Sequence, residues 1–217
     1  MSGVNRGVQE LVRKELARQS VYIHCYNHRL NLVIVDSVKC VQLADSFFSL
    51  QQEIYKFMSS HTANEIYLAN QKERLPGKQL RSLKSLNDTR WSCQYASCKV
   101  LLHTFPAVIS TLEEIAESHT GKRAHDAASL LMNINFTTIL CLVMFTHILH
   151  KTKLVSDMLQ SPSLDLSAAA NMMDTVQQDL ENQRSEEAWH SIWEKGVEMS
   201  QAHKLCYFLS ANSLIFV

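Results

Sequence analysis

Apolar residues recur at the three- and four-residue spacing of helices along most of this 217-residue chain, which predicts a mainly α-helical protein. The first such stripe consists of Val8, Leu11, Val12 and Leu16. Charged residues lie on its other side, so it predicts an amphipathic helix. Later stripes predict helices at about 28–41, 47–58, 64–74, 104–120, 123–160, 164–183 and 186–203.

Capping residues and helix breakers indicate where these helices begin and end. Asp45 or Ser46 is a suitable N-cap for the helix over 47–58. In Thr104-Phe105-Pro106, the proline suits the first turn of a new helix, where its missing N–H costs nothing. Further boundaries are predicted at Pro76-Gly77, Gly121, 133–135, Ser161-Pro162 and Ser185.

Two segments depart from the helical pattern. Residues 21–24 alternate apolar and polar side chains, which predicts a short strand. Either its pairing partners precede Met1, or the strand is a remnant. The apolar, uncharged segment 205–217 is either a buried C-terminal strand or non-native sequence from a truncated reading frame.

Composition supports a helical fold and narrows the classes of function. The chain is 46% hydrophobic and 19% charged, with only 5 glycines and 3 prolines, which favours helices over a turn-rich β fold. The formal net charge is zero, so any attraction to nucleic acid has to come from a local patch. The apolar run 136–149 is too short to span a bilayer, which predicts a buried helix and no membrane partner.

The N-terminus and the cysteines bear on the compartment. Arg6, Glu10 and Arg13 interrupt any apolar segment of a secretory signal. Six cysteines are scattered without paired spacing in a chain large enough to fold without disulfides, which predicts reduced thiols. We therefore expect a nuclear or cytoplasmic protein that is not secreted.

Cys25 and His28 are the first candidates for chemistry, because their spacing matches half of a zinc site. A structural zinc site needs four ligands, usually as two local pairs. Cys93 and Cys98 do not supply the second pair, since residues five apart on a helix point in different directions. Without a second pair of ligands, we expect no metal site. A catalytic role for Cys25 would need an orienting carboxylate, which the pattern does not supply, so we expect no catalytic cysteine either.

A basic strip formed by Lys78, Arg81 and Lys84 is the second candidate, and it is followed by Arg90 and Trp91. Basic side chains bind phosphates, and an aromatic ring stacks on an unpaired base, so this pattern is compatible with a nucleic-acid contact, although composition alone favours the plainer interpretation. A solvated loop that leads into a core tryptophan would give the same pattern.

Three motifs occur together in the chain. They are Cys25-Tyr26-Asn27-His28-Arg29-Leu30-Asn31-Leu32-Val33, Asp88-Thr89-Arg90-Trp91-Ser92 and Thr104-Phe105-Pro106-Ala107-Val108. In combination they resemble the hAT superfamily of DNA transposases, in particular the copies related to zinc finger MYM-type protein 1. The resemblance runs from Met1 to about residue 203, and its motif residues are Cys25, His28, Arg29, Asn31, Asp88 and Thr89.

The resemblance implies an RNase H-like catalytic core that is interrupted by a large helical insertion. Residues 1–28 would then be a remnant of the core, 29–203 the helical insertion domain and 204–217 a tail outside the family. His28 would lie near the active site. Arg90 and Trp91 would lie where the family contacts the transposon end or a flipped base, so these three are the expected nucleic-acid-binding residues.

Catalysis in the family depends on three acidic residues that hold two Mg²⁺ or Mn²⁺ ions. By the resemblance, two of these acids fall before Met1 and the third falls after Val217. We therefore expect a truncated, inactive chain with no catalytic residue and no cofactor, whose remaining function is to bind nucleic acid or protein in the nucleus. The expected partners are DNA and other transposase-like chains. The alternatives are an all-helical protein-interaction module with no DNA role, and half of a transposase completed by a partner chain.

Overall fold

The computed structural model describes residues 14–15, 25–86, 91–161, 163 and 165–203. Lys14 and Glu15 are helical, and within the described residues there is no strand, which confirms the mainly α-helical fold class. The strand expected at 21–24, most of the helix expected near the N-terminus and the segment 205–217 lie outside the described residues. The helices are α2 Tyr26–Lys39, α3 Gln42–Met58, α4 His61–Arg74, α5 Trp91–Ser118, α6 Lys122–Asn133, α7 Phe136–Leu159, α8 Leu166–Asn182 and α9 Glu186–Ala202.

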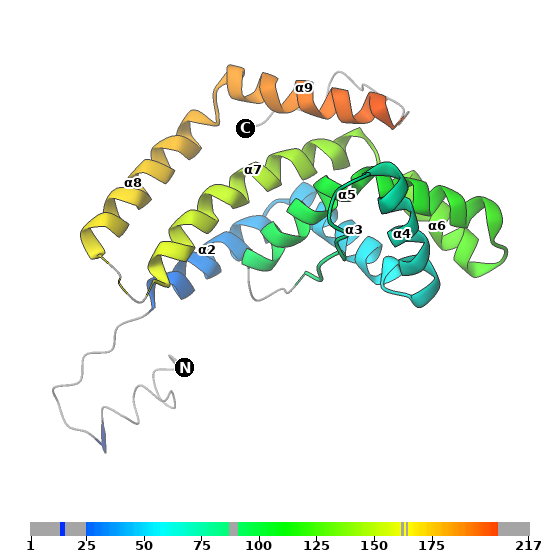
Figure 1. The fold of residues 1–217 in the computed structure, drawn as a ribbon. Helices are drawn as coiled ribbons and strands as arrows, with labels where there is room; N and C mark the ends of the chain where they lie inside the picture. Colours follow the sequence, from blue (N-terminus) through cyan, green and yellow to red (C-terminus); the bar gives the residue numbers. More distant parts are fainter. Residues whose placement is uncertain (1–13, 16–24, 87–90, 162, 164, 204–217) are drawn as a thin grey trace.

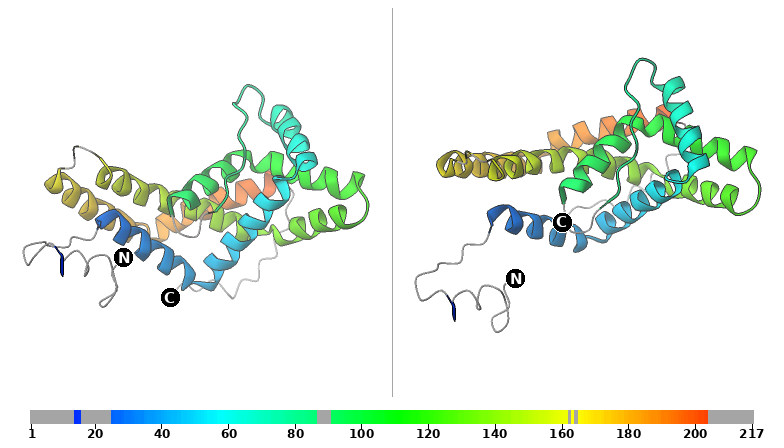
Figure 2. Two further views of the ribbon diagram at one scale, coloured as in Figure 1. Left: turned by 90° about the horizontal axis from the view of Figure 1, so that it is seen from below. Right: turned by 60° about the horizontal axis from the view of Figure 1, so that its bottom comes forward.

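Two long helices, α5 and α7, organise the molecule. α5 packs against α4, α6 and α7, and α7 packs in turn against α8 and α9 (Figure 1). α8 and α9 follow one side of α7, while α2 and α3 lie on its other side. In the turned views the molecule is elongated, with α8 toward one end and α6 at the other (Figure 2).

The hydrophobic core centres on α5. Phe105, Leu112 and Ile115 are at most 1% exposed, and they lie in one cluster with Tyr67 of α4 and Ile139 of α7. The Tyr67 hydroxyl donates a hydrogen bond to Thr104 Oγ1 at 2.8 Å, so the polar atom in this cluster is satisfied. Burial of these side chains fixes the position of α5 between its neighbours.

The expected helix start at Thr104-Phe105-Pro106 is wrong. α5 runs without a break from Trp91 to Ser118, with Pro106 inside it. An interior proline removes one backbone hydrogen bond and costs about 3 kcal/mol. The residues on either side, Phe105 and Ala107, are buried in the core, and their burial holds the helix continuous across the proline.

The N-cap expected for α3 at Asp45 or Ser46 is also wrong. α3 begins at Gln42 with Val41 at its N-cap, and Asp45 lies in the first turn. A carboxylate there still favours the helix, because the first turn has a partial positive charge. The early start follows from burial of Ala44, whose side chain packs inward before the predicted cap.

The other predicted boundaries that can be compared are confirmed. Gly121 separates α5 from α6 and has a φ of 74°, which glycine adopts without strain. Asn135 caps α7 in a capping box, since its side chain accepts a hydrogen bond from the Thr138 amide at 3.1 Å. The Ser185 side chain caps α9 by accepting a hydrogen bond from the Ala188 amide at 3.2 Å.

α7 is the apolar helix predicted from the sequence. The apolar run 136–149 was expected to be too short to span a bilayer, but it continues into a longer helix: among the described helices α7 alone is long and apolar enough to cross a membrane, a test that core helices of soluble proteins also meet. Many of its residues are buried, among them Ile139, Leu142 and Leu149. The pattern predicts a buried helix, and the structure places it between α5 and the α8–α9 pair.

Candidate functional site

The N-terminal family motif lies at the start of α2. Cys25 occupies the N-cap position, and Cys25, His28 and Arg29 are exposed while Asn31 is half-buried. The side chain of neighbouring Asn27 accepts a hydrogen bond from Ser156 Oγ at 2.6 Å, which ties the start of α2 to α7. Asp88, Thr89 and Arg90 lie outside the described residues, as does the side chain of Trp91.

The basic strip lies on the segment 75–86, which follows α4 and contains no helix or strand. Three side chains of neighbouring helices hold its backbone. Gln71 bonds to both the amide and the carbonyl of Arg81 at 2.9 Å. Ser97 donates to the Lys84 carbonyl at 2.8 Å, and Gln52 accepts from the Leu86 amide at 2.9 Å. Lys78 and Lys84 are exposed and Arg81 is half-buried, so the strip is fixed along its backbone and its lysines face solvent.

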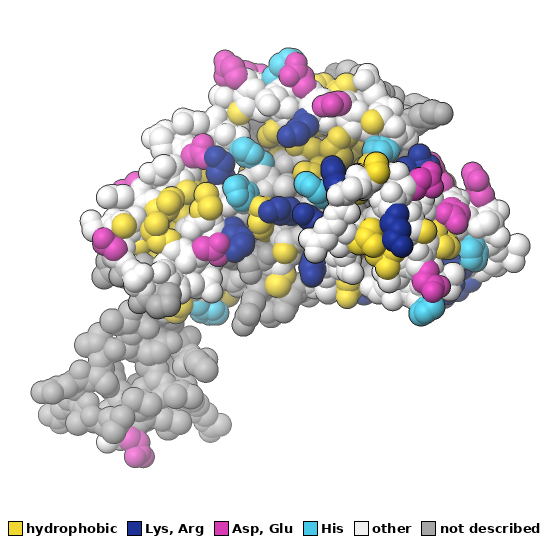
Figure 3. All heavy atoms as spheres, viewed as in Figure 1, with side chains coloured by type: hydrophobic (Ala, Val, Ile, Leu, Met, Phe, Trp, Pro, Cys, Tyr) yellow, Lys and Arg dark blue, Asp and Glu magenta, His cyan; other side chains and the backbone are white. Residues whose placement is uncertain are grey.

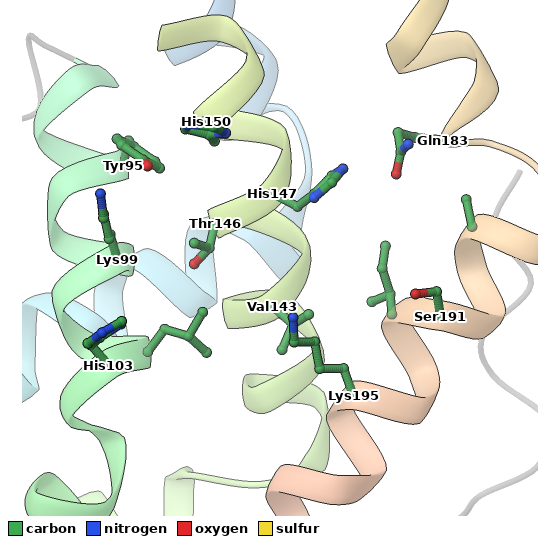
Figure 4. Close-up of a pocket in the computed structure, with 13 residues that line it drawn as sticks. Tyr95, Lys99, His103, Val143, Thr146, His147, His150, Gln183, Ser191 and Lys195 are labelled. Carbon is green, nitrogen blue, oxygen red and sulfur yellow. The ribbon is translucent and has the colours of Figure 1, made fainter. Parts of the chain in front are cut away.

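A groove of about 520 Å³ lies between α5, α7 and α9, and we call it the α5–α7–α9 groove. Figure 4 shows its lining: α7 forms the floor, α5 one wall, and α9 with the preceding turn the other. His147 projects from the floor toward α9, and His150 lies across from Tyr95. The lining residues are Tyr95, Lys99, Leu102, His103, Val143, Thr146, His147, His150, Gln183, Ala188, Ser191, Ile192 and Lys195.

The groove is positively charged. Two lysines and three histidines line it, and among the lining residues that the structure describes there is no carboxylate. Loss of hydration, then the charges of Arg81, Lys78 and Lys99, lower the pKa of His103. The pKa of His147 is lowered as well.

The pKa of His147 is also lowered by loss of hydration and by nearby cations, but the cations are different ones. Loss of hydration contributes most, followed by the charge of Lys151, while Asp179 of α8 acts in the opposite direction. His150 and Lys195 add to the lowering. The Asp179 carboxylate binds the Lys151 ammonium at 2.5 Å, so these two charges largely offset each other and Lys195 contributes the remaining positive charge. Both histidines thus experience a net positive field, which favours an anion in the groove.

An aromatic pair supports one end of the groove. The rings of Tyr95 and His150 have centroids 5.5 Å apart with planes at 30°. The Lys99 ammonium lies 5.7 Å from the centre of the Tyr95 ring. Tyr95 is buried and His150 is exposed, so the tyrosine supports a planar ring that faces solvent.

The basic strip and the groove adjoin one another. A smaller hollow beside Lys78 and Arg81 also includes His103, which lines the α5–α7–α9 groove as well. Figure 3 shows Lys, Arg and His side chains gathered in the middle of this face, with acidic side chains mostly toward its periphery. This face is therefore locally basic, although the net charge of the chain is zero.

The sequence predicted the strip but missed the groove. Lys99 and His103 are one helical turn apart, as are His147 and Lys151, and such cations in largely apolar helices were an available signal. Their meeting with Lys195 depends on how α5, α7 and α9 pack. Within the described residues, no group of three His, Cys, Asp or Glu side chains could hold a metal ion.

Burial makes two of the cysteines poor nucleophiles. It raises the pKa of the Cys98 thiol to about 12 and that of Cys141 to about 11. Both lie in the hydrophobic core. They therefore act as small apolar side chains.

No protein-family model matches this sequence, and no solved structure matches it at a significant level.

Proposed function

We propose that this chain is a hAT-transposase-derived helical module that binds nucleic acid through phosphate contacts and does not itself cut or join DNA. The sequence motifs support the ancestry, and the helical fold is compatible with the insertion domain that the resemblance implies. The single observation that carries the binding role is the basic face formed by the α5–α7–α9 groove and the basic strip.

The charges on this face are arranged to meet a phosphate backbone. Lys78, Arg81 and Lys99 all act on His103, which places their charges around one point of the surface. Lys195 approaches the floor of the groove from α9 on the opposite wall. Several cations that each neutralise a phosphate release counterions, which is the main source of affinity for nucleic acid without sequence preference.

Binding to a short DNA oligonucleotide over a series of salt concentrations tests this role. We expect affinity to fall steeply with salt. In the double variant Lys99→Gln/Lys195→Gln, the slope of log affinity against log salt should decrease by about 2, one for each lost contact. The matched control is Lys56→Gln/Lys122→Gln, which removes the same charge from exposed positions on α3 and α6. An equal loss in both variants, or binding that is insensitive to salt, would contradict the proposal.

The absence of catalysis is tested separately. The purified chain is incubated with DNA and Mg²⁺ or Mn²⁺, and nicked and joined products are measured. We expect neither product. Metal-dependent cleavage that disappears on mutation of a carboxylate of this chain would overturn this part of the proposal and leave the binding role intact.

One observation favours a protein-interaction module instead. An apolar hollow of about 410 Å³ lies where α2, α7 and α8 meet, and Met173, which lines it, is 42% exposed. Exposed apolar side chains of this kind mark protein contacts when they gather in one patch. If DNA does not bind at any salt concentration, this second function becomes the better one.

A further inference from the structure

We propose that the α5–α7–α9 groove holds one unpaired nucleotide, so that this face selects single-stranded over double-stranded nucleic acid. The inference rests on the proposed function and adds a substrate class to it. Three properties of the groove support it: its size, its mixed lining and the supported ring of His150.

The size of the groove suits a single base that has left the duplex. A hollow of about 520 Å³ lies in the range that encloses ligands of small-molecule size. In a duplex the faces of each base are stacked and only its edges reach the grooves. A base can therefore enter a pocket between protein helices only after it leaves the stack or if it was never paired.

The lining combines the two kinds of surface that a nucleotide needs. Leu102 of α5, Val143 of α7 and Ile192 of α9 give apolar contacts from all three sides. Lys99 and Lys195 stand on opposite walls (Figure 4). An inorganic anion would make no use of the apolar part, whereas a nucleotide places its base there and its phosphate beside a lysine.

His150 supplies a surface for stacking. Its exposed ring rests on buried Tyr95, so that its orientation is restrained before any ligand arrives. Single-stranded nucleic acid is recognised in general by unstacked bases that lie on aromatic side chains, histidine included. A restrained ring loses little freedom on binding, which favours affinity.

Four probes test the inference on the full chain. They are a thymidine strand, a blunt duplex with the same number of phosphates, an abasic strand of the same length, and free thymidine monophosphate. We expect the thymidine strand to bind about fivefold or more tightly than either the duplex or the abasic strand, the lower end of what one stacked base contributes. The monophosphate should bind much more weakly than the strand, since it lacks the neighbouring phosphates.

Two variants locate the effect. Ile192→Ser should reduce the preference for the thymidine strand over the abasic strand, and Leu154→Ser, an exposed position of α7 outside the groove, should leave it unchanged. If Ile192→Ser does not fold, His150→Ala gives the same test from an exposed position. A retained preference in a folded groove variant would overturn the inference.

The outcomes separate this inference from the proposed function. If duplex and thymidine strand bind equally and with a salt dependence, the inference is wrong and the nucleic-acid role stands. Equal binding of the abasic strand also overturns it, because the base then contributes nothing. If the monophosphate binds as tightly as the strand, the inference is wrong as well, and the groove is a site for free nucleotides. If no probe binds, both proposals fail.

Discussion

The two sides of the molecule are packed in different ways. Around α5, large side chains such as Phe105, Leu112 and Ile115 are almost fully buried. On the other side, the described buried residues of α9 are Gly196 and Ser200, both small. A large buried side chain fills the space between helices, whereas a small one lets the backbones touch at one point and leaves them apart elsewhere. The α5–α7–α9 groove lies where α9 diverges from this close contact.

The difference shows where the fold leaves room for function. Cationic side chains can keep their charged ends in solvent while their stems cover apolar surface, so they suit the border of an incompletely filled space. Lys99 and Lys195 both have this setting, on opposite walls of the groove. The core side specifies the helical arrangement, and the open side presents charge and apolar surface together.

The largest expected effect is on the packed side. Phe105→Ala should lower the free energy of unfolding by about 3–5 kcal/mol, because it removes an aromatic side chain from the core and leaves a cavity. Ile192→Ala, at a half-buried position in the groove, should cost no more than about 1 kcal/mol. Chemical denaturation of both variants measures the contrast. Equal losses would show that the two sides are packed alike.

The next effect concerns the basic strip. Gln71 is 1% exposed and both donates to and accepts from the Arg81 backbone. Gln71→Glu keeps the shape but places a carboxylate oxygen against the Arg81 carbonyl, at an expected cost of about 2 kcal/mol.

Gln52→Glu is the matched control. Gln52 only accepts a hydrogen bond from Leu86, which a carboxylate does as well, so this change should be close to neutral. Denaturation and limited proteolysis of the segment 79–86 compare the two variants. If Gln52→Glu destabilises as much as Gln71→Glu, the paired hydrogen bonds are not what hold the strip.

A smaller effect is expected where α9 touches α7. A Cβ atom added at Gly196 would lie 2.6 Å from Leu140 Cδ2. Gly196→Val should therefore displace α9, with a loss of about 1–2 kcal/mol and weaker DNA binding at the groove. In Gly196→Ala, the close contact costs little because the end of the leucine side chain can rotate, and the better helix propensity of alanine offsets most of that cost. Unchanged stability and DNA affinity in Gly196→Val would show that the close contact does not position the groove wall.

The sequence predicted what local chemistry decides. Gly121, Asn135 and Ser185 act through their own backbone or their nearest neighbours, and the boundaries they predict are confirmed. Pro106 misled because its local preference is outweighed by core packing on both sides, which involves helices distant in sequence.

The same distinction between local chemistry and long-range packing applies to the candidate site. The basic strip was found because its three residues lie in one short segment. The hydrogen bonds that attach the strip to Gln71 were not predicted, because the sequence around a buried glutamine does not indicate which residue it bonds to. The groove joins Lys99, His147 and Lys195 from three helices, and periodicity within a helix contains no distance to another helix.

The smallest expected effect is the pH dependence of DNA binding. Loss of hydration, followed by the surrounding cations, lowers the pKa of His103 and of His147 below the usual value of about 6.5, so both are mainly neutral at pH 7 in the free protein. A bound phosphate favours the protonated forms and raises both pKa values. Binding therefore takes up protons, and affinity should rise as pH falls from about 7.5 to about 5.5, by up to about fivefold for each histidine.

Acid should have the opposite effect on the stability of the free protein. Because the pKa of each histidine is lower in the folded state than in the unfolded chain, the unfolded chain takes up the proton first. The contribution to stability is therefore complete above the unfolded pKa of about 6.5 and is lost as pH falls below it. His103→Gln/His147→Gln should flatten both profiles, whereas His125→Gln, an exposed position on α6, should change neither. If DNA affinity is constant over this range in the unmodified protein, the histidines of the groove do not face the bound phosphate. The open side of the molecule would then bind through its lysines alone.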